Sequence, residues 1–238
     1  MGIIKKTVAA AAAMAALTIT VGCSQEDGHA QKEGAAGTSA DPSRVDSLVL
    51  DAADFPSGYE VMEIPADKMQ EIADSVLTGT KSAKVTPASC MQMSAIPDDI
   101  DISKVGMRMA SKQLAVLTET VVAEDQQLAT VRKQVEGECK QMTVEITEGP
   151  AAGAKGKVTS SVVDSPATEG RDAIVVQQNT EMSVQGQRVE TKTVVGYAVV
   201  DGYTVTVQAA NSSGGNPDVS AFDELFTKAI EKVEKQTA

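Results

Sequence analysis

The chain has 238 residues, a formal net charge of −12 and 42% hydrophobic residues, of which very few are aromatic. This acidic balance excludes a nucleic-acid binder, which needs a basic footprint. It also disfavours adhesion of the protein surface to anionic lipid headgroups. The length suffices for one domain of ordinary size, with a core built from Val, Ile, Leu, Met and Ala.

The N-terminus has the pattern of a secretory signal peptide over residues 1–22. Lys5 and Lys6 form a short basic region, and the uncharged apolar run 7–22 follows. A run of this length is shorter than the ~20 residues that a spanning helix needs. Removing residues 1–22, which contain two lysines and no acids, leaves the mature chain at −14.

Residues 23–44 predict a disordered tether that begins at Cys23. Gly, Ala, Ser and charged residues dominate this segment, which holds almost no large apolar side chain. His29, the only histidine of the chain, lies here. A catalytic histidine needs a rigid site, so we interpret His29 as a solvated linker residue. A single α+β envelope domain is then expected over 45–238.

The first half of that domain predicts short helices and strands. A strand is expected at 59–64, and apolar residues recur at helical spacing from Met69 to Leu77. Thr86 has the character of an N-cap and Pro87 suits the first position of a second helix. Cys90 would lie in the first turns of that helix.

The acidic loop 96–104 follows. Its oxygen-rich cluster of Asp98, Asp99 and Asp101 could suit Ca²⁺, but the spacing is not that of an EF-hand. A solvated loop with no metal is therefore the preferred interpretation.

The remainder predicts mostly strands. Two strands are expected at 105–111 and 113–122, and a helix at 124–141 with Cys139 on its buried stripe. Period-two alternation then predicts strands at 142–147, 157–164, 172–184, 188–200 and 203–210. Asp201-Gly202 is a hairpin signal, and Asn216 with Pro217 predicts the start of a final helix. The fold class is α+β: an antiparallel sheet of about six or seven strands, flanked by three to four helices, with one disulfide.

The two cysteines of the domain, Cys90 and Cys139, form an even pair in an exported chain. A disulfide is the favoured interpretation. Two free thiols or a metal pair are the alternatives, although no histidine lies near either cysteine.

No arrangement of residues indicates catalysis. The sequence has neither a G-x-S-x-G elbow nor an H-E-x-x-H motif. A serine triad would lack its usual base if His29 lies in the tether. We therefore expect no enzyme, no cofactor and no metal site. A hydrolase would need a cleft with paired acids.

Methionines offer the only candidate ligand site. Met91, Met93, Met107 and Met109 lie close in sequence, and methionine adapts to irregular apolar partners. A small apolar or cell-wall ligand could bind among them, in a pocket that touches at least two of the four. The alternative is plain core filling in a chain with few aromatic residues. Nothing in the sequence specifies an oligomeric state.

Two resemblances predict where in the cell the protein is located. "TVGCS" resembles the lipobox of bacterial lipoproteins: Val21, Gly22 and Cys23 match it, while Thr20 departs from the usual aliphatic residue. The resemblance implies that the Cys23 thiol receives a diacylglyceryl group, which carries two acyl chains. Two chains suffice for stable anchoring on the outer face of the cell membrane.

The order of features along the rest of the chain is similar to that of actinobacterial cell-envelope lipoproteins. It includes "SLVLDAADFPSGYEV", the half-cystine in "TPASC", a second half-cystine late in a helix, a β-rich half and a closing amphipathic helix. The chain is also similar to the extracellular sensor domains of mycobacterial receptor-like serine/threonine kinases. That resemblance implies an antiparallel sheet, flanking helices, disulfides and a ligand cleft.

Two functions of different classes follow as hypotheses. The first is a membrane-anchored lipoprotein that acts as a non-catalytic, sensor-like module for a ligand or protein partner. The second is a lipid carrier or chaperone of the cell envelope. A carrier needs an enclosed apolar cavity, typically of several hundred Å³, whereas a binding module needs only a cleft or a patch.

Overall fold

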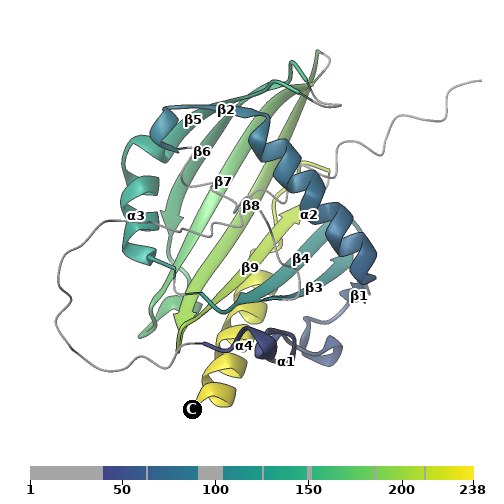
Figure 1. The fold of residues 1–238 in the computed structure, drawn as a ribbon, viewed down its shortest axis with the longest axis vertical. Coiled ribbons are helices and arrows are strands. Elements are labelled where there is room, and N and C mark those ends of the chain that lie inside the picture. The colour runs from purple at the N-terminus through teal and green to yellow at the C-terminus, as the bar shows by residue number, and fades with distance from the viewer. Residues whose placement is uncertain are drawn as a thin grey trace, which may run out of the picture.

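The structure is a computed structural model that describes residues 40–62, 64–90, 104–124, 126–148, 152–184, 186–211 and 213–238. Nine strands form one antiparallel sheet in the order β1-β3-β4-β9-β8-β7-β6-β5-β2 (Figure 1). They are β1 (Glu60–Met62), β2 (Ala83–Thr86), β3 (Val105–Lys112), β4 (Ala115–Val122), β5 (Gln141–Ile146), β6 (Lys155–Val163), β7 (Ala173–Val184), β8 (Gln187–Val200) and β9 (Tyr203–Asn211). The helices are α1 (Val45–Leu48), α2 (Ala66–Lys81), α3 (Leu128–Glu136) and α4 (Val219–Thr237).

The expected count of six or seven strands is wrong, because the sheet has nine. The two edge strands, β1 and β2, are only three and four residues long. Such short strands carry too few alternations to be recognised in sequence. Their partners, β3 and β5, are also separated from them by tens of residues, so no local turn signals the pairing.

The central strands form as their sequence predicts, because tight hairpins join them. Asp201 and Gly202 have φ values of 48° and 82°, and the strands on either side of them, β8 and β9, pair from Val200–Tyr203 onward. Two consecutive left-handed residues are the requirement of a type I′ turn, whose twist matches that of the paired strands. The hairpin signal at this dipeptide is confirmed.

One face of the sheet packs against α4 and α1. The buried residues of α4 recur every three or four positions and include Phe222, Phe226 and Ile230. Phe226 lies against β8 at Gly196, where the Cβ atom of any larger residue would sit 2.6 Å from the ring. The glycine therefore makes room for the aromatic ring at the centre of this core.

The opposite face packs against α3, and α2 crosses in front of the same face (Figure 1). α3 contributes Leu128, Val131 and Val135 to a second core, together with Ile174 and Val195 of the sheet. α2 connects the two edge strands, since it follows β1 and precedes β2 in the chain.

Three expected helix boundaries are corrected. Thr86 is the last residue of β2 and precedes a cis peptide bond to Pro87, so it does not cap a helix. The helix expected at 124–141 is α3, which ends at Glu136; Cys139 lies in the following 3₁₀ turn. Asp218, rather than Asn216, caps α4 by accepting a hydrogen bond from the Ala221 N–H. Local composition suggested each of the expected helix boundaries. Strand pairing and cap geometry place the observed boundaries at other residues.

The folded domain includes residues that composition assigned to the tether. The Asp41 N–H donates to the Tyr203 hydroxyl at 2.9 Å, and that hydroxyl donates to the Asp41 carbonyl at 3.1 Å. The Arg44 guanidinium donates to the Gln236 carbonyl at 2.7 Å. These long-range bonds hold residues 41–44 against the domain.

Candidate functional site

A disulfide lies on the α3 side of the sheet, at the edge that β5 and β2 form. Cys90 and Cys139 are bonded, with their Cα atoms 5.5 Å apart and both side chains fully buried. The predicted disulfide is therefore confirmed. It ties the end of β2 to the turn after α3, on the same sheet edge where β2 pairs with β5. The disulfide holds α3 firmly over its half of the sheet.

On the same face of the sheet, beyond β6, β7 and β8, the neighbouring strands β4 and β9 present polar side chains. Thr118 of β4 lies opposite Gln208 of β9, and Thr120 lies opposite Thr206. Residues paired across strands point to the same side of a sheet. The side chains that alternate with them along the strands, such as Leu117 and Val207, point to the α4 core instead.

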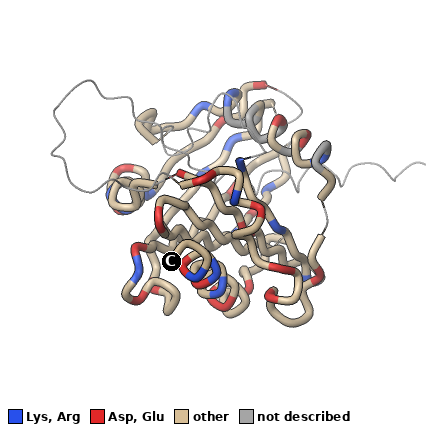
Figure 2. Tube along the Cα trace, turned by 60° about the horizontal axis from the view of Figure 1, so that its bottom comes forward, with Lys and Arg blue, Asp and Glu red and all other residues tan. Residues whose placement is uncertain are grey.

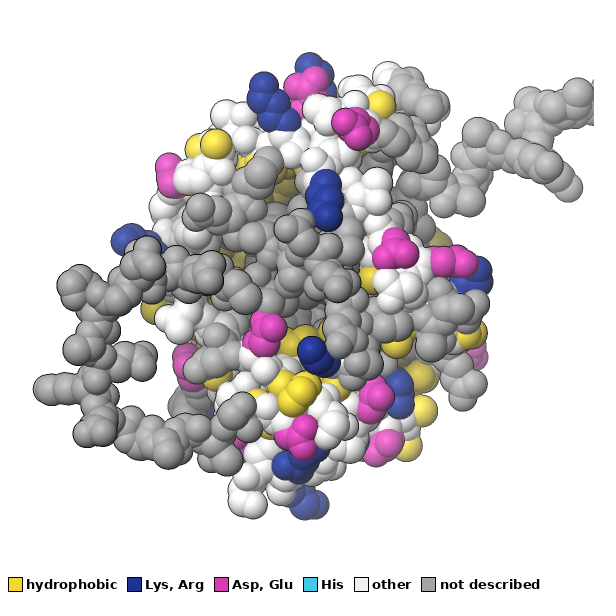
Figure 3. Space-filling model, viewed as in Figure 1, with side chains coloured by type: hydrophobic (Ala, Val, Ile, Leu, Met, Phe, Trp, Pro, Cys, Tyr) yellow, Lys and Arg dark blue, Asp and Glu magenta, His cyan; other side chains and the backbone are white. Residues whose placement is uncertain are grey.

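Methionines continue this face toward the sheet edge. Met109 of β3 lies opposite Thr118, and Met107 lies opposite Thr120. Met62 of β1 extends the row beyond Met109. We call the following six residues the threonine–methionine patch: Met107, Met109, Thr118, Thr120, Thr206 and Gln208. The patch is therefore polar on β9 and β4 and becomes flexible and apolar on the next strand, β3. From this side, hydrophobic side chains show between charged ones in the lower half of the face (Figure 3).

The hydroxyl groups of the patch make no side-chain hydrogen bond within the described ranges. Those of Thr118, Thr120 and Thr206 have no hydrogen-bond partner among the residues that the structure describes, although Thr120 is only 7% exposed. A half-buried polar group without a partner gains most from a ligand that supplies one. The patch can thus hydrogen-bond a ligand on one side and contact its apolar part through methionine on the other.

Two of the four predicted ligand methionines belong to the patch. Met107 and Met109 are half-buried neighbours of the threonines, rather than core residues. Met91 and Met93 lie outside the described residues, as does the predicted lipidation site Cys23. Whether a pocket joins the four methionines therefore stays a prediction.

A separate depression lies at the C-terminal end of α4. It has a volume of about 310 Å³ and is open to the surface, with Arg171, Asp172, Asp201 and Glu234 in its lining. Arg171 is already paired, since its nitrogens lie 3.4 Å from both Glu231 and Glu234. The lining mixes these charged groups with Ala198, Val199, Val200 and Ile230, so the depression is not a purely apolar site.

A metal site would need ligand side chains that lie close together in the described ranges. Within them, no three His, Cys, Asp or Glu side chains come together in a way that could hold a metal ion. The acidic cluster at Asp98, Asp99 and Asp101 lies outside those ranges. Among the helices that the structure describes, none is both long and apolar enough to cross a bilayer.

Comparison with known proteins gives distant likenesses only. No family model matches the chain, and no curated protein matches its sequence. An uncharacterised protein from Mycobacterium smegmatis, an Rv0999 ortholog, has a TM-score of 0.46 and 18% identity, covering 84% of this chain and 100% of its own. The extracellular domain of PknH from Mycobacterium tuberculosis has a TM-score of 0.45 and 14% identity, covering 84% of this chain and 99% of its own. Neither likeness is close enough to transfer a ligand or a residue role.

The polar half of the patch was missed from sequence, although a signal for it exists. In β9, Thr206 and Gln208 alternate with apolar residues, which is the period-two pattern of a strand with one polar face. In β4 the charged Glu119 stands between Thr118 and Thr120 and interrupts that pattern. What the pattern does not reveal is that β4 and β9 are neighbours, since Thr118 and Thr206 are 88 positions apart in the sequence.

Proposed function

We propose that the protein is an extracytoplasmic lipoprotein, anchored through Cys23, that acts as a non-catalytic binding module of the cell envelope. The disulfide supports the compartment, because such bonds form and persist outside the reducing cytoplasm. The signal-like segment 1–22 and the cysteine directly after it support the anchor. The observation that carries the binding role is the threonine–methionine patch.

The chemistry of the patch favours a ligand with both polar and apolar parts. Its three threonine hydroxyls suit the hydroxyl or amide groups of a cell-wall fragment, and Met107 and Met109 suit an adjoining apolar portion. A purely apolar lipid would offer the threonine hydroxyls no hydrogen bonds, which opposes its binding.

The carrier hypothesis has less support than the binding module. A carrier encloses its cargo in an apolar cavity, whereas the depression at α4 is open and its lining mixes charged and apolar residues. The patch is a mixed surface on a sheet face rather than an apolar lining. We therefore place the lipid carrier second.

The anchor is tested by mass spectrometry of the membrane fraction. We expect a mature N-terminus at Cys23 that carries a diacylglyceryl adduct, and release of the Cys23→Ala protein from the membrane. A mature N-terminus elsewhere, without a lipid adduct, would contradict the anchor but would leave the binding role standing.

The binding role is tested by titrating the exported protein with soluble sugar–peptide fragments of the cell wall, and separately with short-chain phospholipids. We expect calorimetric binding of the former, weakened at least fivefold by the double substitution Thr118→Val and Thr206→Val, because each removed hydroxyl loses a hydrogen bond. Thr159→Val is the matched control, since Thr159 is an exposed threonine of β6 at a position that points to the other face.

The outcomes separate the two hypotheses. Sugar–peptide binding that survives the double substitution would contradict the assignment of the site to the patch. Binding of phospholipid alone, unaffected by that substitution, would favour the carrier.

A further inference from the structure

The segment that leads into the domain is held on it by a small set of long-range contacts. We call this segment, Asp41–Phe55, the clasp; it contains α1 and two 3₁₀ turns. Its side chains Val45, Leu48, Val49 and Leu50 are buried against the α4 face of the sheet. Charged residues of both signs surround the end of α4 near which it lies (Figure 2).

Glu119 of β4 lies beneath the clasp and is completely buried. Its carboxylate accepts the Leu50 N–H through both oxygens, at 2.9 and 3.2 Å. This is an unusual position for a carboxylate, because a buried charge normally has an ionic partner. Among the described residues, no lysine or arginine nitrogen lies within ion-pair distance of it.

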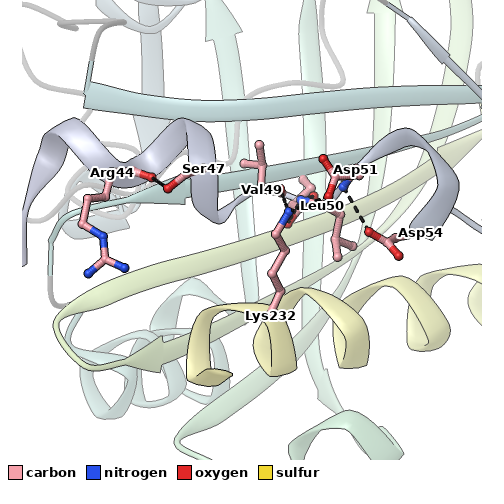
Figure 4. A network of polar contacts seen from close by, with 8 residues as sticks. Arg44, Ser47, Val49, Leu50, Asp51, Asp54 and Lys232 are labelled. Carbon is pink, nitrogen blue, oxygen red and sulfur yellow. Dashed lines mark hydrogen bonds and ion pairs between the residues drawn. The ribbon is translucent and has the colours of Figure 1, made fainter. Parts of the chain in front are cut away.

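The two cations that influence Glu119 are Arg108, its cross-strand partner on β3, and Lys232, whose hydrogen bonds go to the clasp. Lys232 of α4 donates to the Val49 carbonyl at 2.6 Å and lies 3.1 Å from an Asp51 carboxylate oxygen, so it binds the clasp backbone and not Glu119 (Figure 4). Lys228, one turn earlier, donates to the Asp54 carbonyl at 2.9 Å. Two lysines from α4 and one carboxylate from β4 thus hold the second half of the clasp, in addition to the bonds that hold residues 41–44.

We propose that Glu119 makes the seating of the clasp sensitive to pH, so that the clasp is firmly held in acid and loosens as the carboxyl group loses its proton. The geometry carries the inference: the clasp itself seals Glu119 from water, so that lifting the clasp is the local motion that would hydrate an ionised carboxylate. The clasp also packs closely against β3, because a side chain at Gly106 of that strand would collide with the Val45 carbonyl of the clasp.

The electrostatic surroundings agree with this direction. Burial raises the pKa of Glu119 to about 7, from an ordinary value of 4.5. The Leu50 N–H, Lys232 of α4 and Arg108 of β3 act against the rise, and Asp54 adds to it. Asp51 also faces this region, through its contact with Lys232, and the β9 partner of Glu119 is the apolar Val207. The proton is therefore held in the closed state and lost more easily in the open one.

If the proposed anchor is correct, release of the clasp also lengthens the tether between the membrane and the domain. A released clasp adds the 15 residues 41–55 to the tether. Treated as a flexible coil, the chain from Cys23 then has an r.m.s. reach of roughly 32 Å instead of roughly 23 Å. The pH response of the clasp itself does not depend on the anchor, so the two proposals fail separately.

The experiment is hydrogen exchange with mass spectrometry on the exported full chain in mild detergent, at pH 5 and pH 8, after correction for intrinsic exchange rates. With a pKa of about 7 in the closed state and 4.5 in the open one, opening of the clasp should rise on the order of a hundredfold between these pH values. Peptides from the β7–β8 hairpin should change far less.

Two variants make the test specific. Glu119→Gln keeps the shape and an acceptor for the Leu50 N–H but cannot ionise, so clasp exchange should become independent of pH. Lys232→Met should raise clasp exchange at both pH values while the pH response remains, because Glu119 can still ionise. Since Lys232 lowers the pKa of Glu119, its loss should strengthen that response rather than remove it. Glu145→Gln, which changes an acid of β5 that is 41% exposed, is the control and should behave as wild type.

The proposal is overturned if clasp exchange in the wild type is independent of pH, or if Glu119→Gln retains the pH response. It is also overturned if the clasp and the β7–β8 hairpin lose protection in parallel, since that pattern would mean global unfolding with no separate motion of the clasp.

Discussion

The two faces of the sheet are built from the same strands but are covered in different ways. The α4 face is sealed by a long helix whose apolar stripe, centred on Phe222 and Phe226, lies over the strands, with the buried carboxyl of Glu119 near the clasp. The α3 face has an apolar half under a shorter, disulfide-framed helix, and beside it the threonine–methionine patch.

This contrast shows how one strand can serve two purposes. In β4, Leu117 and Val121 contribute to the sealed core, while Thr118 and Thr120 face the patch. Because side chains alternate along a strand, each face can be specified independently of the other. Stability can therefore reside on the α4 face and binding on the α3 face, and the following variants test that division.

The largest loss of stability is expected from Phe226→Ala. The ring is fully buried and rests on Gly196, so truncation leaves a cavity in the α4 core that its neighbours cannot fill. We expect a loss of about 3–5 kcal/mol in the free energy of unfolding, measured in urea. Val219→Ala, at an exposed position of the same helix, should stay within about 0.5 kcal/mol. A small effect of Phe226→Ala would mean that the α4 face is not the main core.

Removal of the disulfide comes next. The double substitution Cys90→Ser and Cys139→Ser opens a loop with a sequence separation of 49, for which chain entropy predicts a loss of up to about 4 kcal/mol. The melting temperature should fall while the circular dichroism of the sheet is retained. If reduced wild type melts at the same temperature as the oxidised protein, the frame around α3 contributes no stability.

The pH dependence of stability probes the buried carboxyl group of the α4 core. The folded pKa of Glu119 is raised above its unfolded value, so its contribution is fully present below about pH 4.5 and is lost as pH rises to about 7. The shift corresponds to about 3 kcal/mol across that window.

Urea unfolding of wild type and Glu119→Gln at several pH values between 4.5 and 8 measures this contribution. The free energy of unfolding of Glu119→Gln should decline much less over this pH range than that of wild type. At pH 8 it should equal or exceed the wild-type value. A wild type that becomes more stable over this range, with Glu119→Gln following it, would show that other groups control the titration.

The smallest effect is expected in the patch. Met107→Ala and Met109→Ala should each lower the free energy of unfolding by less than about 1.5 kcal/mol, because both side chains are only half-buried. Core filling predicts losses of about 2–5 kcal/mol instead. Chemical unfolding of the two variants therefore decides between a binding surface and a structural one.

Local sequence was sufficient for the features that depend on neighbouring residues. Alternation identified the long strands β7, β8 and β9, and the Asp201-Gly202 dipeptide identified the hairpin between the last two. The amphipathic pattern identified α4, and the even pair of cysteines identified the disulfide. Each of these signals lies within a few residues or follows from the chemistry of one residue type.

Only the tertiary structure decided which strands lie at the edges and which become neighbours. β2 is a strand because β5 pairs with it, although its own sequence favours the start of a helix at Thr86. The patch exists because β4 and β9 are adjacent, and Glu119 is buried because the clasp covers it. Such contacts join residues far apart in the chain, and their free energy depends on the whole packed sheet rather than on any local pattern.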